Sequence, residues 1–335
     1  MKLKITFLLI LTTLTVFSQE ENKPKGVVIG KVFFNYHIDT TKDAVQSSAF
    51  ELTRTYLGYK YNFSDKLSAT LLFDSGKGSG NSDFSLFVKN AKLDYKADSW
   101  LTLSVGLFGL KQFKDQEKFW GYRYLYKSFN DKYKFGSSAD AGVMTAMKIS
   151  DKLKIDVLIV NGEGYKKLQD ASGYTRLGTN LVYTPSKSWI FKAYYDTMKG
   201  KDADNITTVS NIALFAGYKL SDKFRIGAEY NIIQNGITYK NVAKGKNQKG
   251  LSFYSTYNIN KKWNVFGRYD QISSNRLSNQ INNWNYTKDG NTIIAGFEFK
   301  PTDKINTSIN YRLTNFEDAT NNNTSLIYFN LKFAF

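Results

Sequence analysis

The sequence contains no cysteine, a single histidine and only three prolines among its 335 residues. Without cysteine, the chain has no disulfide, no thiolate nucleophile and no thiolate ligand for a metal. The lone histidine, His37, also excludes a metal site built from several imidazoles. We therefore expect no cofactor, no metal and no enzymatic activity. A barrel enzyme would have to use His37 as its base, and no nucleophile motif accompanies it.

Long apolar runs are scarce as well, and no stretch after the N-terminus approaches the length of a membrane helix. The one candidate, Ile5–Phe17, follows Lys2 and Lys4, which is typical of a secretory signal peptide. We expect residues 1–18 to be cleaved and residues 19–26 to form a short periplasmic lead. An N-terminal membrane anchor is the alternative, but the run is short for one.

Aromatic residues are abundant, with 25 Phe, 23 Tyr and 5 Trp, and this composition favours long strands. Apolar and polar residues alternate with period two in many segments, such as "LTLSVGLF" (101–108), "LKIDVLIV" (153–160) and "RLGTNLVY" (176–183). Alternation gives each strand one face suited to lipid and one suited to water. The negative mean hydropathy agrees, because only alternate residues of such a strand face lipid.

The connections between these segments are of two kinds. Seven are short and rich in Ser, Asp, Asn or Pro, with Lys after these residues in all but 96–101; they lie at 63–67, 96–101, 149–154, 184–189, 220–224, 258–263 and 300–305. Eight are longer and polar, at roughly 39–47, 76–83, 111–134, 162–171, 198–206, 236–248, 272–287 and 316–323.

Fifteen connections join sixteen strands. The sequence therefore predicts an all-β protein, a closed transmembrane antiparallel β-barrel over residues 27–335 with short periplasmic turns and longer extracellular loops. A soluble β-sandwich or solenoid is the rival fold, but it would turn its apolar faces inward.

The last segment, "LIYFNLKFAF" (326–335), alternates up to its final residue. We expect it to be the sixteenth strand and to close against the first strand near residues 27–38. Phe333 and Phe335 lie on its apolar face. We interpret them as a signal for the outer-membrane assembly machinery.

A sixteen-stranded barrel is too wide for side chains to fill, so we expect an aqueous channel lined by the polar face of each strand. Eight basic residues on that face are pore-lining candidates: Arg54, Lys60, Lys154, Arg176, Lys192, Arg225, Arg268 and Arg312. Two interpretations remain open. These residues either pair with carboxylates to brace the wall, or create a field that favours anions.

The third long loop, 111–134, is rich in lysine and aromatic residues. We expect it to fold inward and narrow the pore, which would place Lys118, Arg123, Lys127 and Lys132 in contact with solutes. The alternative is a loop packed on the outer rim, with its aromatic residues at the level of the lipid headgroups. Helix-forming residues within 114–121 predict a short helical turn there.

The formal net charge is +17, and loss of Lys2 and Lys4 with the signal peptide would lower it to +15. This excess points to anionic partners such as lipopolysaccharide or small anions. Export argues against nucleic acid as a partner.

Three runs of the sequence, 50–74, 87–113 and 139–165, resemble porins of the phosphate-selective O and P type. The resemblance rests on Arg54 in an early strand, "GLFGLKQF" (106–113) before a long loop, and "VNGEGY" (160–165) at the end of a later strand. The richness in Lys, Asn, Tyr and Phe is similar to that of Bacteroidota-type outer-membrane proteins.

The resemblance implies a sixteen-stranded, often trimeric channel that passes anions. The selective members carry a ladder of arginines, whereas this chain has seven arginines and 39 lysines. Lysine binds phosphate as a point charge without a bidentate fork. We therefore expect an outer-membrane porin for small hydrophilic solutes that prefers anions, with phosphate as one candidate. A non-conducting barrel that binds surface ligands through its basic, aromatic loops is the alternative.

Overall fold

The computed structural model describes residues 26–44, 48–77, 84–168, 173–202 and 205–335. The expected signal peptide (1–18) and nearly all of the expected lead (19–26) lie outside these ranges. The first half of the barrel contains β1 Gly26–Asp39, β2 Ser48–Asn62, β3 Leu67–Lys77, β4 Phe84–Lys96, β5 Leu101–Phe108, β6 Asp140–Lys148, β7 Leu153–Val160 and β8 Arg176–Tyr183. The second half contains β9 Trp189–Asp202, β10 Asn205–Lys219, β11 Phe224–Gln234, β14 Gln248–Asn258, β15 Trp263–Ser274, β16 Gly290–Thr302, β17 Ile305–Phe316 and β18 Thr324–Ala334.

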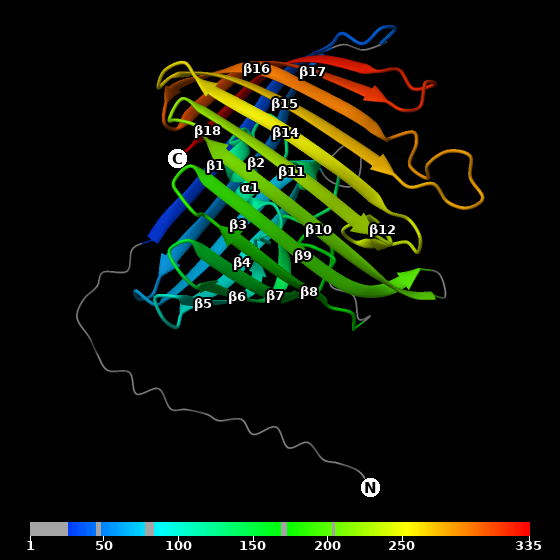
Figure 1. Cartoon of the computed structure of the whole chain (residues 1–335). Coiled ribbons are helices and arrows are strands. Elements are labelled where there is room, and N and C mark those ends of the chain that lie inside the picture. The colour runs from blue at the N-terminus through cyan, green and yellow to red at the C-terminus, as the bar shows by residue number, and fades with distance from the viewer. Residues whose placement is uncertain (1–25, 45–47, 78–83, 169–172, 203–204) are drawn as a thin grey trace.

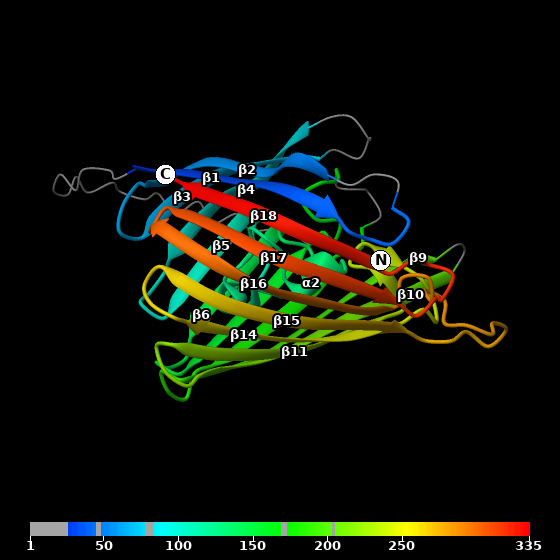
Figure 2. The same ribbon diagram turned by 90° about the horizontal axis from the view of Figure 1, so that it is seen from above.

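These sixteen strands form one closed barrel in which every neighbouring pair is antiparallel, and the predicted fold and strand number are confirmed (Figure 1). The last strand closes the barrel against the first, as expected, with Lys31 opposite Ala334 and Asp39 opposite Leu326. Figure 2 shows the end of β18 beside the beginning of β1. Closure leaves no unpaired strand edge.

The seven short connections all lie at one end of the barrel, which we call the short-turn end, and the longer ones lie at the opposite, long-loop end. Serine side chains shape several turns. The Ser64 and Ser150 hydroxyls, for example, each accept a backbone N–H three residues later, at 3.1 Å. The connection expected at 198–206 is shorter than predicted, because the β9–β10 pairing extends to Asp202 and Asn205.

Register shifts interrupt the strict alternation in three strand pairs, and those in β2 and β4 turn basic residues into the lumen. On β2, Arg54 pairs with Phe33 while Leu52 pairs with Phe34, so Thr53 is the extra residue. On β4, Lys89 is skipped in the same way between partners of β3. A bulge exchanges the two faces of a strand beyond it. Lys89 is therefore turned into the barrel, where it is 7% exposed.

The outer face is apolar and the inner face is polar. Leu103, Val157 and Ile293 are exposed, whereas Ser104, Asp156 and Thr292 are buried. Exposed aromatic residues gather around the short-turn end: Tyr59, Phe63, Tyr95, Trp100, Tyr183, Trp189, Tyr257, Trp263 and Phe335. A girdle of aromatic residues beside an apolar band is typical of strands that cross a membrane.

Three small elements lie in the loops: the helices α1 Lys114–Trp120 and α2 Phe129–Lys132, and a hairpin of β12 Gly236–Thr238 and β13 Asn241–Val242. Helix α1 confirms the helical turn expected within 114–121, whereas α2 and the hairpin were not foreseen. Neither helix has the length or apolar character required to cross a membrane. Figure 1 shows α1, and Figure 2 shows α2, within the ring of strands.

Candidate functional site

The third loop, which spans residues 109–139 in the structure, folds into the barrel and packs mainly on the wall of β9–β17. Trp120 and Tyr122 are 1% exposed, and both rings pack on Phe266 of β15. Phe119 packs on Phe215 of β10. Burial of several aromatic side chains strongly favours this docked position over an extended one.

Three wall arginines hold the loop by its backbone. Arg225 of β11, Arg268 of β15 and Arg312 of β17 donate to the carbonyls of Trp120, Lys127 and Leu125 at 3.2, 2.9 and 2.8 Å, respectively. Carbonyls of an irregular segment inside a barrel lack secondary-structure partners, so each such bond satisfies a group that would otherwise be costly to bury.

Two further basic candidates also support the loop. The Lys192 ammonium donates to the carbonyl of Lys111 and lies 3.1 and 3.0 Å from the side-chain oxygens of Asp115 and Gln116. The side chain of Arg268 forms a bidentate pair with Asp270, with both distances at 2.8 Å. Neither basic side chain has any exposed surface, so neither can meet a solute.

Arg176 supports a second inward loop. Its guanidinium pairs with Asp196, donates to the carbonyl of Tyr239 at 2.5 Å and lies over the Tyr239 ring. The Tyr239 hydroxyl in turn donates to Asp140, which also accepts the backbone N–H groups of residues 162 and 164. The hairpin β12–β13 and the loop after β7 are thereby joined to the third loop inside the wall of β6–β11.

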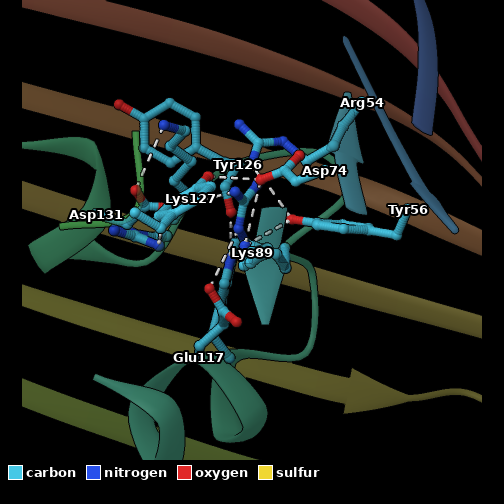
Figure 3. Close-up of polar contacts among 12 residues, drawn as sticks. Arg54, Tyr56, Asp74, Lys89, Glu117, Tyr126, Lys127 and Asp131 are labelled. Atoms are coloured by element: carbon cyan, nitrogen blue, oxygen red, sulfur yellow. Dashed lines mark hydrogen bonds and ion pairs between the residues drawn. The ribbon is translucent and has the colours of Figure 1, made fainter. Parts of the chain in front are cut away.

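The opposite side of the lumen is formed by β1–β4 and carries a cluster of charged side chains (Figure 3). Asp74 accepts hydrogen bonds from Arg54 at 2.7 Å, from Lys89 at 3.5 Å and from the Tyr165 hydroxyl at 2.5 Å. The Tyr56 hydroxyl lies 3.3 Å from the Lys89 ammonium. The buried Asp74 thus gathers two cations on this side of the wall.

The third loop faces this cluster with charges of its own. Arg123 lies 3.2 Å from Glu117 and 3.0 Å from Asp131, and Lys127 lies 3.4 Å from Asp131. Burial would raise the pKa of Asp131, but Arg123 and Lys127 hold it well below its usual range. Burial in the lumen lowers the pKa of the Lys127 ammonium to about 8, with Arg123 and Arg54 adding to the shift and Asp131 opposing it.

Three neighbouring cavities, all lined in part by Lys111, lie between the loop and the short-turn end, with volumes of about 980, 320 and 710 Å³. Sixteen basic residues line them: Lys31, Lys60, Lys66, Lys89, Lys92, Lys96, Lys111, Lys114, Lys118, Arg123, Lys148, Lys154, Lys187, Lys219, Arg225 and Lys332. Seven acidic residues accompany them: Asp65, Asp94, Asp115, Glu117, Asp131, Asp151 and Asp156. The excess of cations gives this half of the lumen a positive field.

A fourth cavity of about 350 Å³ lies on the long-loop side of Arg123. Its basic lining consists of Arg54, Arg123, Lys127, Lys132 and Arg312, with Glu51 as its one acid. Phe33, Arg123 and Tyr124 line both this cavity and the 710 Å³ cavity below it. Arg123 therefore lies between the two halves of the lumen.

The basic residues proposed from the sequence separate into two groups. Five of the eight wall residues line a cavity: Arg54, Lys60, Lys154, Arg225 and Arg312. Arg176, Lys192 and Arg268 face inward as the alternation indicates, but loops cover them, and they brace those loops. All four loop residues, Lys118, Arg123, Lys127 and Lys132, line a cavity.

Sequence reasoning missed several basic residues of the lumen. Lys31 and Lys332 lie on the inward faces of the first and last strands, so their alternation was a usable signal. Lys89 had no such signal, because it is the extra residue of a bulge. Lys111 and Lys114 belong to the third loop, where no alternation of apolar and polar residues predicts which way a side chain points.

The proposed assembly residues lie at the seam of the barrel. Gly30 and Phe335 exchange two backbone hydrogen bonds of 3.1 Å each, and the Phe335 ring lies directly over Gly30. Phe333 and Phe335 are exposed on the outer face. The absence of a side chain at Gly30 leaves room for the terminal ring.

Comparison with known proteins places this fold among outer-membrane barrels. Residues 167–333 match the family model described as outer membrane protein beta-barrel domain. No curated protein sequence matches the chain.

Solved structures are similar over nearly the whole chain. The outer membrane channel DcaP of Acinetobacter baumannii has 12% identity and a TM-score of 0.69, covering 95% of this chain and 99% of that one. The anion-selective porin from Comamonas acidovorans has 10% identity and a TM-score of 0.69, covering 93% and 100%. In-vitro folded OmpT of Vibrio cholerae in its trimer form has 12% identity and a TM-score of 0.63, covering 93% and 99%. At such low identity, the similarity establishes a shared fold.

Proposed function

We propose that this protein is an outer-membrane porin, a passive diffusion channel for small hydrophilic solutes that prefers anions. The observation that supports it best is that the third loop packs mainly on β9–β17 and leaves cavities beside β1–β4. The loop touches β1 through Tyr124 on Phe33, while the cavities lie along β1–β4 on both sides of Arg123. A continuous route past Arg123 is what a porin requires.

The charge of this route supports the anion preference. A solute entering from the long-loop end would meet the five cations of the 350 Å³ cavity, Arg123 among them, and then the fifteen other cations of the lower cavities. Rings of Lys and Arg are a common means of selecting anions in pores. The predominance of lysine favours general anion passage over phosphate specificity.

The same proposal predicts the partners of the barrel and its orientation in the membrane. The apolar outer band would contact lipid and lipopolysaccharide of the outer membrane, with the short-turn end toward the periplasm. Two of the similar structures are an anion-selective porin and a trimer form of OmpT, and we propose anion selectivity and a trimer for this chain. Phe333 and Phe335 at the seam would be read by the assembly machinery.

Planar-bilayer recording tests the channel and its selectivity together. We expect ohmic steps from the refolded protein, in groups of three if the barrel is a trimer. In a KCl gradient, we expect a reversal potential whose sign shows that chloride is more permeable than potassium. Heat-unfolded protein in the same detergent is the control.

The two outcomes against the proposal are distinct. A cation-selective reversal potential would contradict the charge argument. No conductance above that of the control would contradict the channel and leave a binding barrel as the better interpretation.

A further inference from the structure

Asp74 of β3 lies behind the basic side chains on the β1–β4 side of the lumen. Its side chain is 1% exposed. Its two cationic partners are accessible from different directions, because Arg54 lines the 350 Å³ cavity and Lys89 lines the 710 Å³ cavity. One enclosed carboxylate therefore controls two cations that face the two halves of the lumen.

Two β-bulges direct these cations at Asp74. On the neighbouring strands, Asp74 pairs with Tyr56 of β2 and with Phe87 of β4. Arg54 directly follows the extra residue of the β2 bulge, and Lys89 is the extra residue of the β4 bulge. Bulges commonly re-aim a side chain beside a functional site. Both neighbours of β3 thus depart from regular pairing where each supplies a cation to the same carboxylate.

The donors around Asp74 are arranged as in an anion-binding site (Figure 3). Arg54, Lys89 and the Tyr165 hydroxyl all donate to one oxygen, Oδ2, at 2.7, 3.5 and 2.5 Å. They come from β2, from β4 and from the loop after β7. Converging donors of this kind, two of them charged, are suited to the oxygen of a free oxyanion. Here that position is taken by a carboxylate of the chain itself.

We propose that Asp74 is a tethered counter-anion, which occupies the anion position between Arg54, Lys89 and Tyr165 and thereby keeps permeating anions weakly bound. This inference rests on the proposed function, because it concerns how the anion channel releases its solutes. A pore must attract ions and yet bind them weakly enough to let them leave. Arg54 and Lys89 attract an anion by their charge, but the anion must compete with Asp74 for their N–H groups.

The alternative role of Asp74 is to lower the positive charge of the lumen and nothing more. Asp94 provides the comparison, because it lines the 320 Å³ cavity and pairs with one cation, Lys92, at 2.7 Å. Loss of either carboxylate removes one negative charge from the lumen. Only loss of Asp74 releases two cations that converge on one position.

Block of the chloride current by sulfate in planar bilayers distinguishes the two roles. Sulfate is the probe because it is an oxyanion whose charge stays constant near pH 7. Asp74→Asn and Asp94→Asn should each raise the anion-to-cation permeability ratio roughly 2-fold, since each removes one charge. Only Asp74→Asn should strengthen the block by sulfate, by roughly 10-fold, the effect of about one charge-assisted hydrogen bond. Equal block by sulfate in the two variants would overturn the proposal.

A double variant, Asp74→Asn with Lys89→Gln, covers the case in which the single variant does not fold. It removes one acid and one cation, so the net charge of the parent protein is kept. Arg54 and Tyr165 remain to bind sulfate, and we expect block roughly 3-fold stronger than in the parent. A role in charge alone predicts the block of the parent, and that result would contradict the proposal. Heat-dependent mobility on gels shows which variants form a barrel.

Calorimetry with sulfate on the detergent-solubilised barrel separates this inference from the proposed function. If the parent conducts and Asp74→Asn binds sulfate no more tightly than Asp94→Asn, the role of Asp74 is refuted and the porin stands. If the parent does not conduct and Asp74→Asn still binds sulfate more tightly, the anion position at Asp74 is supported and the porin is refuted.

Discussion

At the scale of single residues, the basic side chains of the lumen perform two different tasks. Arg268 and Lys192 are fully enclosed and hold the third loop in place. Arg54, Arg123 and Lys127 surround the passage and share the carboxylates of Asp74 and Asp131. Because a buried charge is tolerated only with good partners, each group is tied to its acids or carbonyls.

The titration of Lys127 gives a prediction about pH. Its pKa is lowered to about 8, so its charge is present below that pH and lost above it. We expect the anion-to-cation permeability ratio to fall roughly 2- to 5-fold between pH 7 and 9, as for one unit charge acting across a few ångströms of water. Reversal potentials measured across this range check the prediction.

Two variants of Lys127 serve as controls, because one lacks the titrating charge and the other keeps its charge at all these pH values. Lys127→Met should show the low ratio already at pH 7, with little further change to pH 9. Lys127→Arg should keep the high ratio throughout, since arginine stays charged. A pH profile in Lys127→Met identical to that of the parent protein would assign the titration to another group.

At the scale of elements, the third loop determines the width of the channel. Its two ends are adjacent, because the backbone N–H of Leu110 donates to the carbonyl of Ser138 at 3.2 Å. A short Gly-Ser linker can therefore replace residues 112–136 without moving β5 or β6. We expect the conductance of this variant to rise several-fold and its anion preference to decrease. Unchanged conductance would show that the loop does not narrow the pore.

The seam between β1 and β18 gives a prediction about stability. A Cβ added at Gly30 would lie 2.2 Å from the Phe335 ring, whereas one added at Gly267 on β15 would have its nearest neighbour at 3.9 Å. We expect Gly30→Ala to destabilise the barrel by up to about 1 kcal/mol, because the exposed Phe335 ring must move aside. The matched control, Gly267→Ala, should be nearly neutral. Heat-dependent mobility of the folded barrel on gels measures both, and equal midpoints would contradict the packing argument.

At the scale of the whole molecule, the inward loops fill the lumen unevenly and leave cavities beside β1–β4. The hydrogen bonds that hold these loops join residues that are distant in the chain. Arg312 and Leu125, for instance, are separated by 187 positions. Tyr124 and Glu298, which share a hydrogen bond of 3.1 Å, are separated by 174. The two sides of the lumen therefore differ although the strands around it share the same alternation.

The amino-acid sequence by itself determined the closed barrel, the number of strands, the short turns and the apolar outer face. These properties depend on side-chain alternation and turn residues, which are local along the chain. Most inward positions could be assigned in the same way, including Arg54, Arg225 and Arg312. The bulges at Thr53 and Lys89 could not be predicted from the sequence, because a bulge depends on the register with the neighbouring strand.

Only the tertiary structure decided which inward residues remain accessible. Alternation places Arg176 and Arg225 on the same inner face, yet the first is enclosed beneath Tyr239 and the second lines a cavity. The difference arises from where the loops dock, and docking depends on aromatic burial and on hydrogen bonds formed across the lumen. Such contacts have no periodic signature along the chain, so they become visible only once the barrel is closed.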